Sequence, residues 1–263
     1  MTDDTIRFDD GASYEQMMGR WSALVGDAFL DWLAVPPGAR WLDVGCGNGA
    51  FTARVVERCA PARVQAFDPS PGQLAFARTR LTAGSPVVWA EADAMALPVS
   101  DGTSDVAVMA LVLFFVPQPL LGVSEMVRAV QPGGVVAAYH WDILGGGFPF
   151  SAIGHAVKEA GGSPRLPPSV EASTLEASEA LWRGAGLERV EVTTFTVQRQ
   201  FRNFEDYWDS AALSNTMRPV FAEFDASGIA ALKIATRKRL CDSGGSLWVS
   251  ARANAVRGVR PAR

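Results

Sequence analysis

The sequence predicts an α/β protein built on a seven-stranded, mostly parallel sheet. Short apolar stretches of strand length alternate with stretches whose apolar residues recur at helical spacing, a pattern typical of a parallel sheet covered by helices on both faces. The first strand, Trp41–Val44, runs into a loop with glycines at alternate positions, Gly45, Gly47 and Gly49. Glycine allows positive φ and the close approach of a ligand to the backbone, so this turn predicts a binding loop.

The other elements follow in a regular order. The expected strands are 41–44, 63–68, 87–94, 105–109, 135–139, 187–197 and 246–256. The expected helices are one or two within 14–33, then 50–59, 73–81, 119–130, 151–160, 174–184, a mainly helical 203–224, and 229–241. Thr174 suits the N-cap of its helix, and residues 128–134 are expected to end a helix and turn. The strands are short and apolar, as expected for strands buried on both sides.

Acidic residues accompany the first three strands. Asp43 stands two residues before the first loop glycine, Asp68 ends the second strand, and Asp93 follows the third. A carboxylate at the end of the second strand can accept hydrogen bonds from both hydroxyls of a ribose. The alternative for Asp68 is the N-cap of the following helix, and Asp43 could simply cap its turn. Asp93 could likewise do no more than end its strand.

Together these motifs resemble the class I S-adenosylmethionine-dependent methyltransferases. The stretch Trp41–Asp142 is similar to their type 11 group, which contains the ubiquinone and menaquinone methyltransferases. Its D-x-G-x-G-x-G pattern departs from the dinucleotide fingerprint G-x-G-x-x-G, whose third glycine would fall at Ala50. The resemblance implies a Rossmann-like class I fold, with an antiparallel last strand inserted between its fifth and sixth neighbours and a small helical lid. It also implies S-adenosylmethionine as the cofactor.

The resemblance also assigns a cofactor site. The residues expected to bind the cofactor are Tyr14, Arg20, Asp43, Gly45, Cys46, Gly47, Asp68, Pro69, Gln73, Asp93, Ala94, Met109, Ala110 and Phe114. In the family the glycine loop holds the methionine moiety, with Asp43 orienting the loop or meeting the amino group through water. Asp93 and the next backbone amide are expected to contact the adenine. Relatives carry a small polar residue and a glutamine where this chain has Met109 and Ala110, so backbone contacts are expected there.

The N-terminal segment and the two histidines supply further candidates. Tyr14 and Arg20 suit the carboxylate of the cofactor, although Arg20 could equally be a surface residue. His140 ends the fifth strand, where active sites of open α/β sheets lie, and is the candidate general base; the alternative is a structural histidine. His155 is expected on a lid helix. An aromatic set could line an acceptor pocket or belong to the core: Phe114, Phe115, Trp141, Phe148, Phe150, Tyr207 and Trp208.

Composition narrows the classes of function. Of 263 residues, 48% are hydrophobic and 20% charged, and the net charge of −4 argues against a dedicated nucleic-acid surface. No apolar run reaches the ~18 residues of a membrane helix, and the acidic N-terminus is unlike a signal peptide. The three cysteines lack metal-ligand spacing, so no metal is expected. A cytoplasmic protein, monomeric or homodimeric, is the expectation.

The sequence therefore predicts a methyltransferase acting on a small organic molecule. Transfer to an oxygen, nitrogen or carbon atom by in-line displacement is expected. Residues 1–35 are expected to form a helical segment over the cofactor site, and residues 36–263 the methyltransferase domain with lid insertions at about 143–170 and 203–224. Two alternatives stay open: a protein that binds the cofactor without transferring its methyl group, as a partner or regulator, and an NAD-dependent dehydrogenase on the same sheet.

Overall fold

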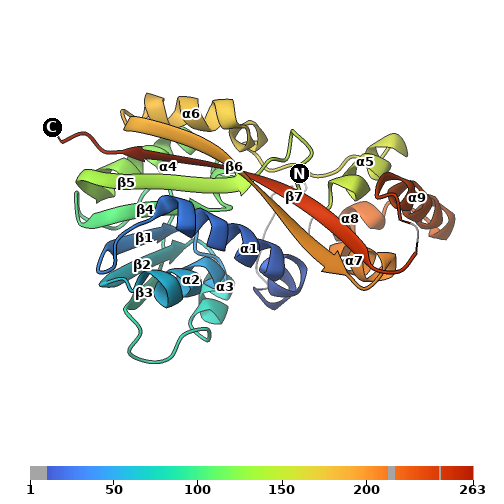
Figure 1. Cartoon of the computed structure of the whole chain (residues 1–263), viewed down its shortest axis with the longest axis horizontal. Coiled ribbons are helices and arrows are strands. Elements are labelled where there is room, and N and C mark those ends of the chain that lie inside the picture. Colours follow the sequence, from blue (N-terminus) through green and yellow to red (C-terminus); the bar gives the residue numbers. More distant parts are fainter. Residues whose placement is uncertain (1–10, 213–216, 243, 263) are drawn as a thin grey trace.

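The chain folds around one mixed sheet (Figure 1). The structure, a computed structural model, describes residues 11–212, 217–242 and 244–262, and of residues 11–14 and 16 only the backbone. The described strands run in the order β3-β2-β1-β4-β5-β7-β6. Their bounds are β1 Arg40–Val44, β2 Arg63–Asp68, β3 Val87–Glu91, β4 Ser104–Ala110, β5 Val130–Trp141, β6 Glu188–Phe201 and β7 Leu247–Val259. Strands β1 to β5 pair in parallel, and β7 is antiparallel to both β5 and β6. The predicted fold class is confirmed.

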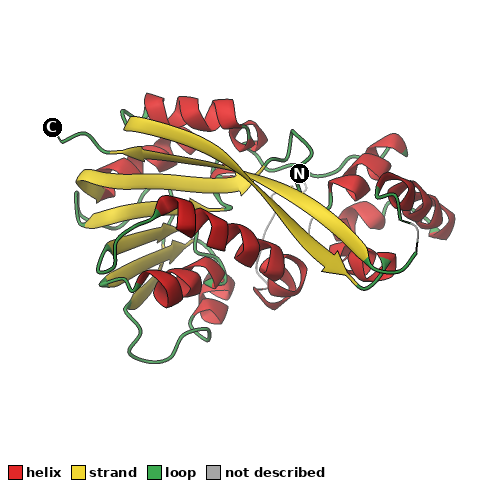
Figure 2. Ribbon diagram, in the orientation of Figure 1, coloured by secondary structure: helices red, strands yellow, loops and turns green. Residues whose placement is uncertain are grey.

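Helices cover both faces of this sheet (Figure 2). Their bounds are α1 Gly11–Leu33, α2 Ala50–Cys59, α3 Pro71–Ala77, α4 Pro119–Ala129, α5 Ser151–Glu159, α6 Leu175–Gly184, α7 Phe204–Ala212, α8 Met217–Phe221 and α9 Ala226–Arg239, with short 3-10 turns η1 Leu113–Phe115 and η2 Val170–Ser173. Successive strand residues point to opposite faces: Trp41 packs in the core beneath α1 and α2, and Leu42 in the core beneath α4 and α6.

Local capping explains where several helices begin. The Ser70 hydroxyl accepts from the Gln73 amide at the start of α3, and the predicted cap Thr174 accepts from the Ala177 amide at the start of α6. The Asp225 carboxylate accepts from the Gly228 amide, so α9 begins three residues earlier than its apolar spacing predicted. Side-chain caps satisfy amides that have no partner within the helix.

The antiparallel pair β6–β7 extends beyond the rest of the sheet (Figure 1). Pairing between β6 and β7 runs from Glu188↔Val259 to Phe201↔Leu247, whereas β5 pairs with β7 only as far as Trp141↔Ala253. The projecting half lies beside α5, α7, α8 and α9. These helices come from the two segments expected as lid insertions and from the region that follows them. None of the described helices combines the length and the apolar character needed to cross a membrane.

Candidate functional site

The glycine loop lies at the edge of the sheet where β1 and β2 end. The amides of Gly45 and Cys46 donate to the Phe67 carbonyl at 2.7 and 2.9 Å. One carboxylate oxygen of Asp68 accepts from the Gly47 amide at 2.8 Å, and the other accepts from the Ser70 amide at 2.9 Å. Asp68 therefore ties the loop after β1 to the turn after β2, and each of its oxygens keeps a lone pair for a further donor.

The three loop glycines have different surroundings, although all have positive φ. A β-carbon on Gly45 (φ 75°) would lie 2.5 Å from the methyl carbons of Val112, and one on Gly49 (φ 77°) would lie 2.8 Å from Trp89. A β-carbon on Gly47 (φ 52°) would meet no described atom within 4 Å. Gly45 and Gly49 thus fit closely against the protein. Gly47 instead borders a space that a ligand could fill.

Asp43 contributes a buried acceptor behind this loop. Its side chain is 2% exposed, one oxygen accepts from the Thr52 hydroxyl at 2.5 Å, and the other has no partner among the described residues. Burial raises the pKa of Asp43 to about 7. A buried acceptor without a donor is uncommon and calls for an explanation. A hydrogen-bond donor or a cation on a bound ligand would explain it. The loop, Asp43 and Asp68 therefore fit a cofactor with an amino group and a ribose.

Other residues expected to bind the cofactor lie along the same edge. Cys46 is buried, and burial raises the pKa of its thiol. Gln73 is buried in the first turn of α3, and Pro69 is exposed in the turn before it. Asp93 is exposed, and one of its oxygens accepts from the Met95 amide at 2.8 Å, so Asp93 caps its own turn. Ala94, beside it, is partly buried.

The end of β4 leaves only the backbone of Met109 available to the cofactor, as the sequence predicted. Met109 is fully buried in the core beneath α4 and α6, and its terminal methyl lies near Gly122. Its side chain therefore points away from the glycine loop, whereas Ala110 faces the other way and is partly buried. Leu111 follows with φ 63°, a conformation that residues with a side chain rarely adopt and that is typical of functional sites.

Helix α1 reaches the glycine loop through a residue that the sequence did not indicate. Glu15 accepts from the Asn48 side-chain amide at 3.2 Å and forms an ion pair with Arg80. Arg20 is exposed and lies near Arg199, whose guanidinium pKa is lowered by burial and by this neighbouring charge. Five residues correspond to about 140° of helix rotation, so Arg20 and Glu15 face different ways. The side chain of Tyr14 lies outside the described residues.

The geometry does not support His140 as a general base. The residue is fully buried on the face of β5 toward α6, with Nε2 2.9 Å from the Ser178 hydroxyl and Nδ1 without a partner among the described residues. Burial lowers its pKa to about 4. Trp141, the next residue, lines the cavity described below, and His140 does not. The arrangement matches the alternative, a structural histidine.

Burial of His140 predicts an acid-dependent loss of stability. Its pKa is about 4 in the folded state and 6.5 as the ordinary value, so the unfolded chain takes up a proton first and stability falls as the pH drops from 6.5 toward 4. Between pH 7 and pH 5 the His140 imidazole should lower the free energy of unfolding by about 2 kcal/mol. Urea unfolding of the wild type and of His140→Gln at both pH values measures it. Asp43, whose raised pKa makes the folded state more stable as the pH falls, affects both proteins equally, so the difference in pH dependence between them reports on His140 alone. The same pH dependence of unfolding free energy in both proteins would contradict the prediction.

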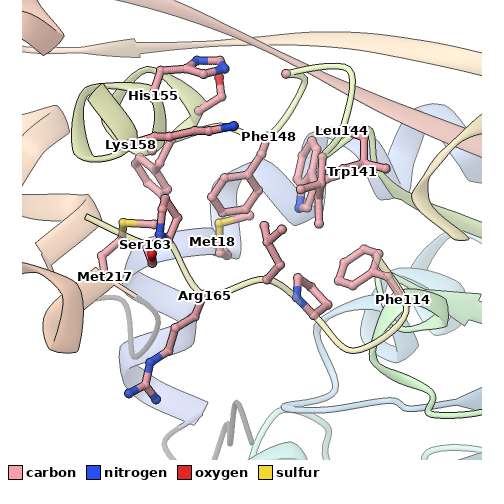
Figure 3. Close-up of a pocket in the computed structure, with 18 of the residues that line it drawn as sticks. Met18, Phe114, Trp141, Leu144, Phe148, His155, Lys158, Ser163, Arg165 and Met217 are labelled. Atoms are coloured by element: carbon pink, nitrogen blue, oxygen red, sulfur yellow. The ribbon is translucent and has the colours of Figure 1, made fainter. Parts of the chain in front are cut away.

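A largely apolar cavity of about 450 Å³ adjoins the loop region (Figure 3). Its described lining residues are Met17, Met18, Leu111, Phe114, Phe115, Trp141, Ile143, Leu144, Gly146, Phe148, Phe150, Ser151, Gly154, His155, Lys158, Gly162, Ser163, Pro164, Arg165, Leu166, Pro167 and Met217. Five of the seven aromatic residues singled out in the sequence lie in this lining, whereas Tyr207 and Trp208 are buried behind it. The cavity lies at the carboxyl ends of β4 and β5, where ligand sites of open α/β sheets occur.

The cavity and the glycine loop share one segment of chain. Val112 packs against Gly45, while Leu111 and Phe114 line the inner end of the cavity. A ligand held by the loop would therefore lie next to a second ligand in the cavity. Among the described residues no group of three or more His, Cys, Asp or Glu side chains is placed to hold a metal ion.

Comparison with known proteins agrees with this arrangement. A family model described as a methyltransferase domain matches residues 42–138. A ubiquinone/menaquinone biosynthesis C-methyltransferase, UbiE of Ruegeria sp. (strain TM1040), is 35% identical over 111 residues, which cover 41% of this chain and 44% of that protein. The chain thus spans less than half the length of this curated relative.

Solved structures are similar over most of the chain. The YcgJ protein of Bacillus subtilis has a TM-score of 0.60 at 12% identity, covering 92% of this chain and 99% of that one. Phosphoethanolamine N-methyltransferase 2 of Haemonchus contortus, in complex with S-adenosyl-L-methionine, has a TM-score of 0.58 at 19% identity, covering 95% of this chain and 56% of that one. At these identities the likeness concerns the fold.

Proposed function

We infer that the whole chain is an S-adenosylmethionine-dependent methyltransferase acting on a small organic molecule, because residues 42–138 match a family model described as a methyltransferase domain and the chain is similar to a C-methyltransferase. The main structural support for methyl transfer is the segment 111–114, which adjoins both the glycine loop and the apolar cavity. Val112 adjoins the glycine loop, and Leu111 and Phe114 line the cavity. This contiguity suits the transfer of a group from one ligand to the other.

The residues around the loop fit the cofactor. The open space at Gly47 leaves room for a ligand against the backbone, and the unpartnered oxygen of Asp43 suits an amino group. Asp68 retains acceptor capacity for a ribose, and Asp93 has a second oxygen for an adenine amino group. When bound, S-adenosylmethionine supplies an activated methyl group on a positively charged sulfur. The aromatic rings of Phe114 and Trp141 suit a neighbouring cation.

The inner end of the cavity positions the acceptor and excludes water. Met18, Leu111, Phe114 and Trp141 provide apolar surface there, and none of them can take up a proton at neutral pH. Holding two reactants in line supplies on the order of 7–11 kcal/mol of a barrier. The lining therefore favours an acceptor atom that is already nucleophilic, or that loses its proton to solvent, over one that needs a protein base at this end.

A transfer assay separates this proposal from its main alternative. The protein is incubated with methyl-labelled S-adenosylmethionine and a panel of small phenols, amines, thiols and quinols, with and without a carboxylate, and labelled products are sought. We expect label in at least one product with the wild type, and none with Asp68→Ala. Binding of the cofactor with no labelled product would favour a cofactor-binding partner or regulator, which the lack of a base at the inner end also suits.

A further inference from the structure

Helix α5 presents a polar face to the outer part of the cavity. Ser151, His155 and Lys158 all line the cavity, and their spacing of four and three residues places them on one side of a helix. The other side carries Ile153, and with it Ala156 and Val157, which are buried. The helix thus turns a hydroxyl, an imidazole and an ammonium group toward a cavity whose other walls are largely apolar.

Lys158 brings an uncompensated charge to this face. It has no ion pair or hydrogen bond within the described part of the chain, and no Asp or Glu is among the described residues that line the cavity. Two acids near this part of the cavity are engaged elsewhere: Glu159, the residue after Lys158, pairs with Arg239, and Asp142, at the end of β5, pairs with Arg252. Figure 3 shows the Lys158 side chain extending across the cavity toward Phe148.

The other cation in the lining has a different orientation. Arg165 follows Ser163 and Pro164 in the loop after α5, and its guanidinium points away from the middle of the cavity (Figure 3). The inner wall, formed by Leu111, Phe114 and Trp141, is apolar. The cavity therefore has an apolar inner end, beside the glycine loop, and a positively charged outer end on α5.

We propose that the methyl acceptor is an amphipathic carboxylate. Its apolar body, a ring system or hydrocarbon, lies against Phe114, Trp141 and Phe148, and its carboxylate binds Lys158 with hydrogen bonds from Ser151 or His155. A single ammonium group matches the single charge of a carboxylate. The volume of about 450 Å³ lies within the range of small-molecule sites. This inference rests on the proposed function, since it names the class of substrate for the same cavity.

A matched pair of probes tests the charge preference. 2-Naphthoate and 2-naphthylmethanol have the same ring system and differ in the charge of the attached group. Calorimetric titration of each into wild type saturated with S-adenosylhomocysteine should show tighter binding of the naphthoate. Lys158→Met should weaken naphthoate binding about tenfold and leave alcohol binding within twofold. Lys158→Arg should retain most of the naphthoate affinity, because it keeps the charge.

A control variant, Lys238→Met, and the binding of S-adenosylhomocysteine distinguish failure of this proposal from failure of the proposed function. Lys238→Met removes another exposed lysine, from the last turn of α9 and outside the cavity lining, and should bind the naphthoate as the wild type does. Equal affinity of the wild type for the two probes, binding of neither, or an unchanged Lys158→Met variant would overturn the proposal. The methyltransferase proposal stands in each case provided that S-adenosylhomocysteine binds; failure of that titration alone points to the function and not to Lys158.

Discussion

Gly47→Ala should weaken S-adenosylhomocysteine binding by at least tenfold while the protein stays folded. Gly47 has φ 52°, and its β-carbon would enter a space that holds no described atom within 4 Å. The left-handed conformation costs an alanine about 1–2 kcal/mol, which lowers the free energy of unfolding. The larger effect is on binding, because the added methyl group occupies the space proposed for the methionine moiety. Calorimetric titration measures the affinity, and urea unfolding measures the stability.

Gly38→Ala is the matched control for this prediction. Gly38 also has positive φ, 83°, and a β-carbon there also meets no described atom within 4 Å. It precedes β1 at the opposite edge of the sheet, away from the glycine loop. Both variants should lose similar stability, and only Gly47→Ala should lose affinity. Equal affinities in the two variants would contradict the position given to the cofactor.

Gly45→Ala should destabilise the fold itself, by about 3 kcal/mol. The strain of φ 75° contributes about 1–2 kcal/mol for a residue with a side chain. The β-carbon would also lie 2.5 Å from both methyl carbons of Val112, and overpacking of this kind typically costs about 1–3 kcal/mol. Urea unfolding of Gly45→Ala against the wild type measures the sum.

A double-mutant cycle separates these two causes. Val112→Ala removes the two methyl carbons and leaves a β-carbon 3.0 Å away, so it should relieve much of the clash and none of the backbone strain. The combined variant should therefore be more stable than the sum of the single changes predicts, with a coupling of about 1–2 kcal/mol. Strict additivity would show that contact with Val112 does not explain the requirement for glycine at this position.

The fold could be predicted from the sequence because its strands and turns carry strong local signals. Helix 50–59 and strand 63–68 were predicted at their observed bounds, because the glycine loop marks the end of the first strand and the start of that helix. The prediction of secondary structure failed where pairing with a strand distant in sequence overrides the turn preference of the local residues. Residues 130–134 were expected to turn, yet β5 begins at Val130, which pairs with Ser104 across a bulge. Gly133 has φ 81° within the strand, and its amide donates to the Arg260 carbonyl.

The site was predicted less completely, for reasons of tertiary placement. Alternation along β5 puts His140 and Trp141 on opposite faces, but the side on which the cavity forms depends on α1, α5 and the loops that line it. The same alternation on β4 turns the Met109 side chain away from the loop, which is consistent with the backbone contacts predicted there. Glu15 and Lys158 have no local signature, since their importance arises from contacts or a cavity formed by segments far apart in the sequence. Asp43 and Asp68 could be found because they adjoin the glycine motif.

Calorimetric titration of the wild type with S-adenosylmethionine, S-adenosylhomocysteine and NAD tests the central claim most directly. The glycine loop, the unpartnered oxygen of Asp43 and the carboxylate of Asp68 predict that both sulfur compounds bind and that NAD does not. A parallel thermal unfolding scan should show a higher melting temperature with S-adenosylhomocysteine, since ligands that bind only the folded state stabilise it. A folded protein that binds neither sulfur compound would contradict the cofactor site and, with it, the proposed methyl transfer.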